Sequence, residues 1–178
     1  MPRFGVRELS LALMHRMRDL NPERVEDALS QIGATRAELR AAHTQWTAMA
    51  HSSRAPKGLA VLRMALGPQR HSGSRTIGAL TCEVARWALP YWPGLELEAL
   101  VGPDGEVWNL WFVRPSGELR LGLDELVPWT CVIADVAASF PGAIQGEGGA
   151  PQHWVVDFTH DGRPYRALFV YGLLQRVR

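Results

Sequence analysis

The histidines and aspartates around residue 157 are the side chains in this sequence whose types could support chemistry. Imidazole and carboxylate groups at His153, Asp157, His160 and Asp161 would suit zinc and similar ions, or acid–base work. In a strand, His153 and Asp157 share a face. Asp161 and Gly162, however, are what a hairpin turn requires, so a turn is the simpler interpretation. The sequence therefore predicts no catalytic residue, no metal site and no cofactor. An enzyme would need an active site that no known motif signals.

Two cysteines, Cys82 and Cys131, are too few for a disulfide framework or a zinc cluster. We predict that both are small buried apolar residues, and the alternative is a reactive thiol.

Positive charge gathers in the first part of the chain. The net charge is only +1, but residues 1–75 contain 12 Arg/Lys against 6 Asp/Glu, whereas residues 76–178 contain 7 against 12. Such an asymmetry favours an anionic partner for the basic part. The alternative is that these arginines are simply solvated surface residues.

The basic part has the pattern of a helix-turn-helix unit. Asn21-Pro22 predicts the start of a helix that Gly33 ends, and Thr35 with Glu38 predicts a capping box for the next helix. The second helix of such a unit can enter the major groove of DNA, and the alternative is an ordinary small helical bundle. The predicted nucleic-acid-binding residues are Arg36, Arg40, His43, Thr47, Arg54 and Lys57.

Apolar alternation and turn residues predict the rest of the chain. We expect a polar linker at 69–75, and a helix over 77–87. Glu96 and Glu98 should face water from the first of three strands, and the segment 142–151 should be mobile. We expect the three strands at 95–101, 107–113 and 119–123, and the helix that follows them at 128–140. The last two strands are expected at 154–158 and 165–171.

This order predicts an α+β fold, with an N-terminal helical bundle that contains the helix-turn-helix-like unit and then an α-βββ-α-ββ domain with an antiparallel sheet. The predicted domains are a basic helical domain, 1–70, and an acidic α+β domain with a five-stranded antiparallel sheet, 71–178. An apolar fraction of 47% is enough for a core.

Trp108 and Trp111 stand out in the strand expected at 107–113. Three positions apart, they should point to opposite faces of that strand. At least one should then lie under the helices, in a dimer interface or in a ligand groove, so both are predicted partner-binding residues.

The element order over residues 75–178 resembles the type III secretion chaperones and the related YbjN-like proteins. The resemblance implies peptide binding and dimer formation. The chain departs from that family because residues 172–178 are too short for a clear final helix.

The leading hypothesis is a non-catalytic nucleic-acid-binding regulatory or accessory protein. Its basic helices would contact DNA or RNA, and its α+β domain would form a homodimer or bind a second partner. The alternative is a protein- or peptide-binding adaptor or chaperone with a protein client. Arginines interrupt every apolar run near the start of the sequence, so we expect a cytoplasmic protein without a membrane partner.

Overall fold

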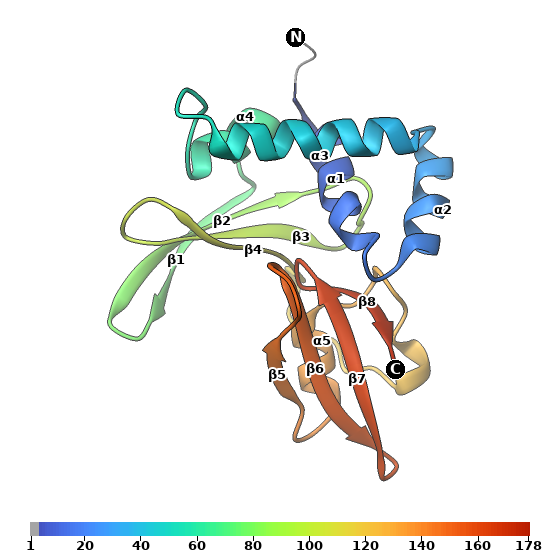
Figure 1. The fold of residues 1–178 in the computed structure, drawn as a ribbon. Coiled ribbons are helices and arrows are strands. Elements are labelled where there is room, and N and C mark those ends of the chain that lie inside the picture. Colours follow the sequence, from blue (N-terminus) through green and yellow to red (C-terminus); the bar gives the residue numbers. More distant parts are fainter. Residues whose placement is uncertain (1–3) are drawn as a thin grey trace.

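The computed structural model describes residues 4–178, and within them it contains five α-helices and two antiparallel sheets (Figure 1). The predicted α+β class is confirmed. No helix in this range is both long and apolar enough to cross a bilayer. In chain order the elements are α1 (Val6–Met17), α2 (Pro22–Ile32), α3 (Arg36–His51), α4 (Leu59–Leu66), β1 (His71–Ile77), β2 (Leu80–Ala88), β3 (Glu96–Val101), β4 (Val107–Val113), the 3-10 turn η1 (Leu123–Glu125), α5 (Ile133–Ser139), β5 (Ile144–Glu147), β6 (His153–His160), β7 (Arg163–Val170) and β8 (Leu173–Val177).

The caps of α2 and α3 lie where the sequence predicts them. Asn21 accepts a hydrogen bond from the backbone N–H of Arg24 at 3.2 Å. Gly33 ends α2 with φ 62°, a left-handed conformation that other residues adopt at a cost. Thr35 and Glu38 form the capping box of α3. Together α2, the short turn and α3 form a helix-turn-helix-like unit, in which α3 lies across the end of α2 (Figure 1).

The first sheet is a meander in which β1, β2, β3 and β4 follow chain order. It corrects two predictions, because most of the expected helix over 77–87 is β2 and most of the expected linker at 69–75 is β1. The apolar residues between 77 and 87 also fit a helical period. Gly78, with φ 59°, instead closes a tight turn between β1 and β2, so the chain reverses there. Trp87 then enters the main core, while Val84 lies on the opposite face.

The second sheet is a meander of β5, β6, β7 and β8. Two four-stranded sheets thus replace the single five-stranded sheet that the sequence predicted. β6 and β7 are the two strands expected near the end of the chain. β5 lies in the glycine-rich segment expected to be mobile, and β8 in the short segment after Gly172.

Residues 119–123 do not form the predicted third strand. The backbone N–H of Leu119 donates to the Asp135 carboxylate at 2.8 Å, and that of Leu121 donates to Ser139 Oγ at 2.8 Å. Side chains of α5 therefore satisfy backbone groups that a neighbouring strand would otherwise bind.

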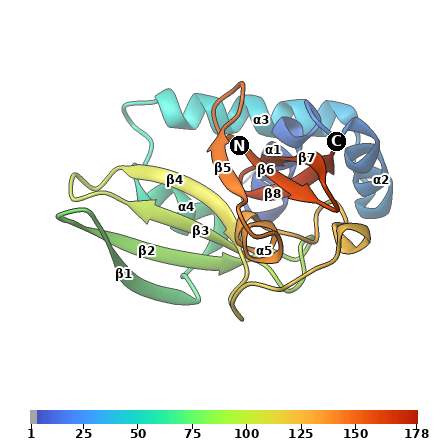
Figure 2. The same ribbon diagram turned by 90° about the horizontal axis from the view of Figure 1, so that it is seen from below.

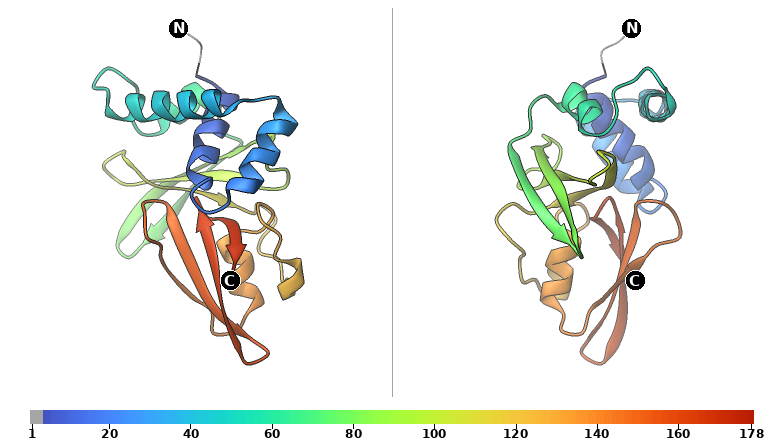
Figure 3. Two further views of the ribbon diagram at one scale, coloured as in Figure 1. Left: turned by 45° about the vertical axis from the view of Figure 1, so that its right-hand side comes forward. Right: turned by 90° about the vertical axis from the view of Figure 1, so that its left-hand side faces the viewer.

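Two large hydrophobic cores hold the described elements together. The main core is formed by the four helices α1, α2, α3 and α4, by one face of the first sheet and by the β7–β8 turn. A smaller core lies between α5 and the second sheet (Figure 3). The two sheets meet where the backbone N–H of Phe112 donates to the carbonyl of Tyr171 at 2.6 Å. The division into domains 1–70 and 71–178 stays a prediction.

Candidate partner-binding face

The register of β3 against β4 slips by one residue at Trp108. Val101 pairs with Val107, whereas Leu100 pairs with Asn109. β4 therefore contains one residue more than β3 over this stretch, which is a β-bulge.

The bulge shows that the prediction of opposite faces for Trp108 and Trp111 is wrong. Trp111 pairs with Glu98. The Trp108 ring covers Gly102, where an added Cβ would lie 2.0 Å from the ring. Val101 points into the main core, and successive residues of a strand point to opposite faces of the sheet. A Cβ added at Gly102 would therefore point away from the main core, and the side chain of Glu98 points to that same face. Both tryptophans therefore lie on the face of the first sheet turned away from the helices, which we call the outer face.

Three large apolar side chains are exposed at one end of the outer face. Ile77, Leu80 and Trp108 are 43%, 47% and 44% exposed, and we call them the apolar patch. Ile77 pairs with Leu80 across the β1–β2 turn. This turn and the β3–β4 turn lie at the same end of the sheet (Figures 1 and 2). On the same face of the sheet, Cys82, Val84 and Leu100 form a small buried cluster.

A buried carboxylate organises the centre of the outer face. Glu98 on β3 is 0% exposed, so the prediction that it faces water is wrong. Its carboxylate accepts hydrogen bonds from Arg75 Nη2 at 3.0 Å, Arg86 Nε at 2.8 Å and Trp111 Nε1 at 2.8 Å. These three donors come from β1, β2 and β4, so the cluster spans the whole sheet.

The hydrogen bonds decide the ionisation of Glu98. Burial would raise the pKa of this carboxyl, but the bonds from Trp111, Arg75 and Arg86 outweigh burial and hold the pKa below its ordinary value. Glu98 is therefore ionised at neutral pH. Two guanidinium groups share one carboxylate, which leaves the cluster with a formal charge of about +1.

A cavity of about 440 Å³ lies beside this cluster, lined by residues of the first sheet and of α5, and we call it the arginine cleft. Arg75 and Arg86 line one side, and Arg114 lines another. Trp111 lines the same cavity.

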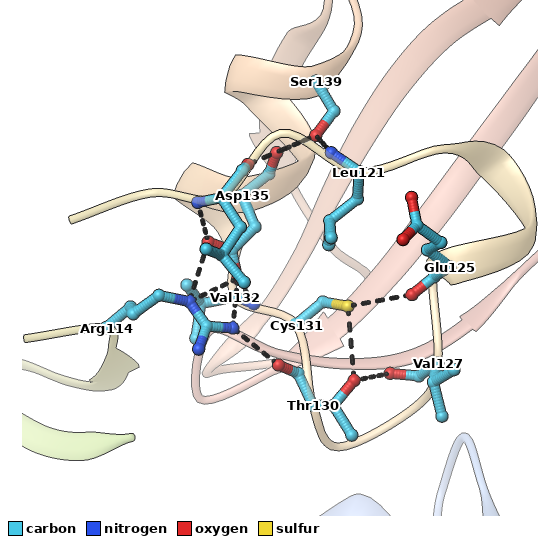
Figure 4. A network of polar contacts seen from close by, with 10 residues as sticks. Arg114, Leu121, Glu125, Val127, Thr130, Cys131, Val132, Asp135 and Ser139 are labelled. Atoms are coloured by element: carbon cyan, nitrogen blue, oxygen red, sulfur yellow. Dashed lines mark hydrogen bonds and ion pairs between the residues drawn. The ribbon is translucent and has the colours of Figure 1, made fainter. Parts of the chain in front are cut away.

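Asp135 of α5 fixes the position of Arg114 and of the loop before α5 (Figure 4). Its buried carboxylate accepts hydrogen bonds from Arg114 Nη2 at 2.9 Å, from the Leu119 N–H at 2.8 Å and from the Val132 N–H at 3.0 Å. In the same network, burial raises the pKa of the Cys131 thiol, which therefore stays protonated at neutral pH. The prediction that both cysteines are buried is confirmed.

The residues predicted to bind nucleic acid lie along α3 and the loop that follows it. Arg40 and Thr47 are exposed on α3. Arg36 is also exposed, but its Nε donates to Glu26 Oε1 at 2.7 Å, so part of its charge is neutralised.

In the loop, Arg54 and Lys57 are exposed, and Lys57 Nζ donates to the carbonyl of Ala50 at 2.8 Å. The binding role of all these residues stays a prediction.

His43 does not belong to that exposed face. Its ring stacks on the ring of His15 of α1, with the centroids 4.1 Å apart, and Nδ1 of each ring is buried without a partner among the described residues. Burial lowers the pKa of both rings. The charge of Arg16 lowers both further, and that of Asp19 partly opposes it.

We expect acid to weaken the contact between α1 and α3. Because the folded pKa values of His15 and His43 lie below 6.5, the unfolded chain takes up protons first, and stability falls as the pH drops below 6.5. The free energy of unfolding, measured with urea at about pH 7.5 and about pH 5.5, should decrease less in His43→Phe than in the wild type. The exposed His51 supplies the matched variant, His51→Phe. An equal decrease in all three proteins would contradict this prediction.

The histidines and aspartates around residue 157 do not converge. Asp157 accepts two hydrogen bonds from Arg166, at 2.6 and 2.8 Å. His153 Nε2 lies 3.9 Å from Asp19 Oδ2, in the turn after α1, and His160 Nε2 lies 3.5 Å from Asp161 Oδ2, so the four residues form separate pairs. Within residues 4–178, no three His, Cys, Asp or Glu side chains are grouped as metal ligands would be.

Sequence reasoning did not bring Arg75, Arg86 and Glu98 together, and it placed Glu98 in water. Arg75 fell in the expected linker and Arg86 in the expected helix, so neither was placed on a sheet. The apolar residues between 77 and 87 fit a helix as well as a two-sided strand, so no local signal in this segment placed these arginines on a sheet.

Comparison with known proteins adds no family. No family model and no curated protein matches this sequence. A crystal structure described as a putative beta-lactamase inhibitor protein from Streptococcus mutans is 16% identical, and the match covers 73% of this chain and 85% of that one. Its TM-score of 0.27 is too low to support an argument about fold or function.

Proposed function

We propose that this chain is a non-catalytic protein-binding module, and that its outer face docks a partner protein. The observation that carries the proposal is the apolar patch beside the paired arginines of the Glu98 cluster. Tryptophan and arginine are the residues most enriched where protein interfaces obtain their binding energy. Clustered exposed apolar side chains bordered by polar ones are typical of interaction sites.

The free energy available from burying the apolar patch also supports the binding of a partner protein. Each of Ile77, Leu80 and Trp108 leaves close to half of its surface in water. Covering the exposed parts would contribute on the order of 1 kcal/mol for each side chain. The Glu98 cluster is held by hydrogen bonds before a partner arrives, so its arginines lose little side-chain freedom on binding. This function corresponds to the adaptor alternative from the sequence.

The test is site-specific photo-crosslinking in the source cells. A crosslinker at position 80 or 108 should capture the same protein, and one at position 64, where Met64 is 45% exposed on α4, should not. The purified partner should then bind the double variant Ile77→Ser, Leu80→Ser at least about tenfold more weakly than wild type, and bind Met64→Ser unchanged. Equal binding to all three proteins would contradict the proposal.

Self-association is a separate outcome of this test. Light scattering after gel filtration measures the mass of the wild type and of the double variant. A dimer that the double variant abolishes would make the outer face a homodimer interface, and would overturn docking of a different protein.

Nucleic-acid binding is the second candidate function, and the exposed surface of α3 favours it. Arg36, Arg40 and Thr47 lie on that surface in a helix-turn-helix-like unit. Fluorescence anisotropy with duplex and single-stranded DNA tests it alongside the crosslinking. Binding that falls steeply with salt and weakens in Arg36→Ala, Arg40→Ala would favour this function, and no binding at low salt would remove it.

A further inference from the structure

The arginine cleft contains guanidinium N–H groups that the protein itself does not use. Arg86 donates to Glu98 through Nε, and none of the hydrogen bonds among the described residues involves its two Nη atoms. Arg114 donates through Nε and Nη2, and none of the hydrogen bonds among the described residues involves its Nη1. Neither arginine has a buried atom without a partner, so these free N–H groups are accessible to solvent, and both residues line the cleft.

The two arginines cannot turn away from the cleft at low cost. Arg86 is held against Glu98, and Arg114 against Asp135, and both carboxylates are 0% exposed. The side chains of Arg86 and Arg114 are only 23% and 14% exposed. A fixed guanidinium edge with unused Nη donors fits the two oxygens of a carboxylate.

Most of the remaining wall is apolar. The apolar residues that line the cavity include Trp111, Val113, Ile133, Ala134 and Ala137. A volume of about 440 Å³ lies in the range of small-ligand sites. The cleft therefore combines an anion-binding edge with space for an apolar group.

We propose that the arginine cleft binds a carboxylate that carries an apolar group. Such a ligand is either a free organic acid or the C-terminal residue of a peptide, and both present the same chemistry to the cleft. Arg86 binds the carboxylate, and Trp111 packs against the apolar group. This site does not depend on a partner at the apolar patch.

One carboxylate on the rim opposes an anion. Glu118 lines the cleft and is exposed, and Glu98 and Asp135 are already fully engaged by their own donors. The charge of Glu118 should repel the ligand, so its removal should tighten binding.

Calorimetric titration of the whole chain at constant ionic strength tests the site. The probes are 3-phenylpropanoate, its uncharged amide and inorganic phosphate. We expect the acid to bind and to shift the indole Nε1–H signal of Trp111, which the Trp111→Phe variant identifies by its loss. The amide should bind at least about tenfold more weakly, because it cannot form the charge-assisted pair.

Variants separate a specific site from general attraction of anions. Arg86→Gln should weaken binding of the acid at least about tenfold, whereas Arg163→Gln, an exposed arginine of β7, should not change it. Glu118→Gln should tighten it a few-fold. Ala137→Phe fills the cleft from an exposed position on α5, keeps the core intact, and should abolish binding.

Titration with acetyl-Ala-Ala-Phe, with either a free or an amidated C terminus, distinguishes a peptide ligand from a free organic acid. Binding of the free-carboxyl peptide, but not of the amidated one, assigns the cleft to a protein terminus, and binding of 3-phenylpropanoate alone assigns it to a free acid. Equal binding of acid and amide, phosphate binding as tightly as the acid, or full binding to Ala137→Phe would each overturn the proposal. None of these results decides whether a partner docks on the apolar patch, which crosslinking tests separately.

Discussion

Replacement of Asp135 by alanine should lower the free energy of unfolding by about 3–5 kcal/mol. The carboxylate is 0% exposed, and its loss would leave the Arg114 guanidinium and the backbone N–H groups of Leu119 and Val132 without their acceptor. Arg114 is itself only 14% exposed, so water cannot fully replace the missing partner. Urea unfolding followed by tryptophan fluorescence measures the change.

The control for Asp135 is Asp124→Ala, because Asp124 is exposed in η1. Its free energy of unfolding should stay within about 0.5 kcal/mol of wild type. A loss of less than about 1 kcal/mol in Asp135→Ala would show that this network does not hold the loop before α5 in place.

Replacement of Glu98 by glutamine should lower the free energy of unfolding by about 2 kcal/mol. The substitution keeps the size of the side chain but leaves Arg75 and Arg86 without a negative charge between them. The expected loss is smaller than for Asp135, because these arginine side chains are 38% and 23% exposed and water compensates them in part. Urea unfolding at neutral pH measures it.

Acid titration provides the check on the Glu98 prediction. The pKa of Glu98 lies below its ordinary value of 4.5, so its contribution is present above pH 4.5 and is lost as the pH falls through the folded pKa. The difference between wild type and Glu98→Gln should therefore shrink in acid. The control is Glu96→Gln, two residues away and half-buried, with an expected change within about 0.5 kcal/mol. Equal stability of both variants at neutral pH would contradict the prediction.

Both substitutions also bear on the proposed functions. Glu98 positions Arg75 and Arg86 on the outer face, and Asp135 positions Arg114 in the arginine cleft. Partner docking should therefore be measured on variants of the exposed Ile77 and Leu80, and ligand binding on variants of the exposed Glu118 and Ala137 as well as of Arg86, whose variant needs a measurement of stability beside it.

Local signals determined the helical part of the chain. The cap at Asn21, the left-handed Gly33 and the capping box of Thr35 and Glu38 act within a few residues, so their effect does not depend on what packs around them. For the same reason the hairpin between β6 and β7 lies at Asp161 and Gly162, as expected.

The predictions for the sheets were wrong where the spacing of the apolar residues fits more than one kind of secondary structure. Apolar residues between 77 and 87 fit both a helix and a two-sided strand, and only the pairing of β2 with β1 and β3 selects the strand. Residues 119–123 alternate as a strand does, yet the donors on their backbone bind Asp135 and Ser139 in place of a neighbouring strand.

The sequence by itself determined the α+β class, the helix-turn-helix-like unit and the strands β6 and β7, because caps, turns and alternation are properties of short segments. The outer face could not be found in this way. Trp108 joins Trp111 on one face only because of a bulge in the β3–β4 register, and Glu98 is buried only because Arg75 and Arg86 reach it from two other strands. Such long-range pairings depend on where segments far apart in the sequence meet, and only the tertiary structure decides that.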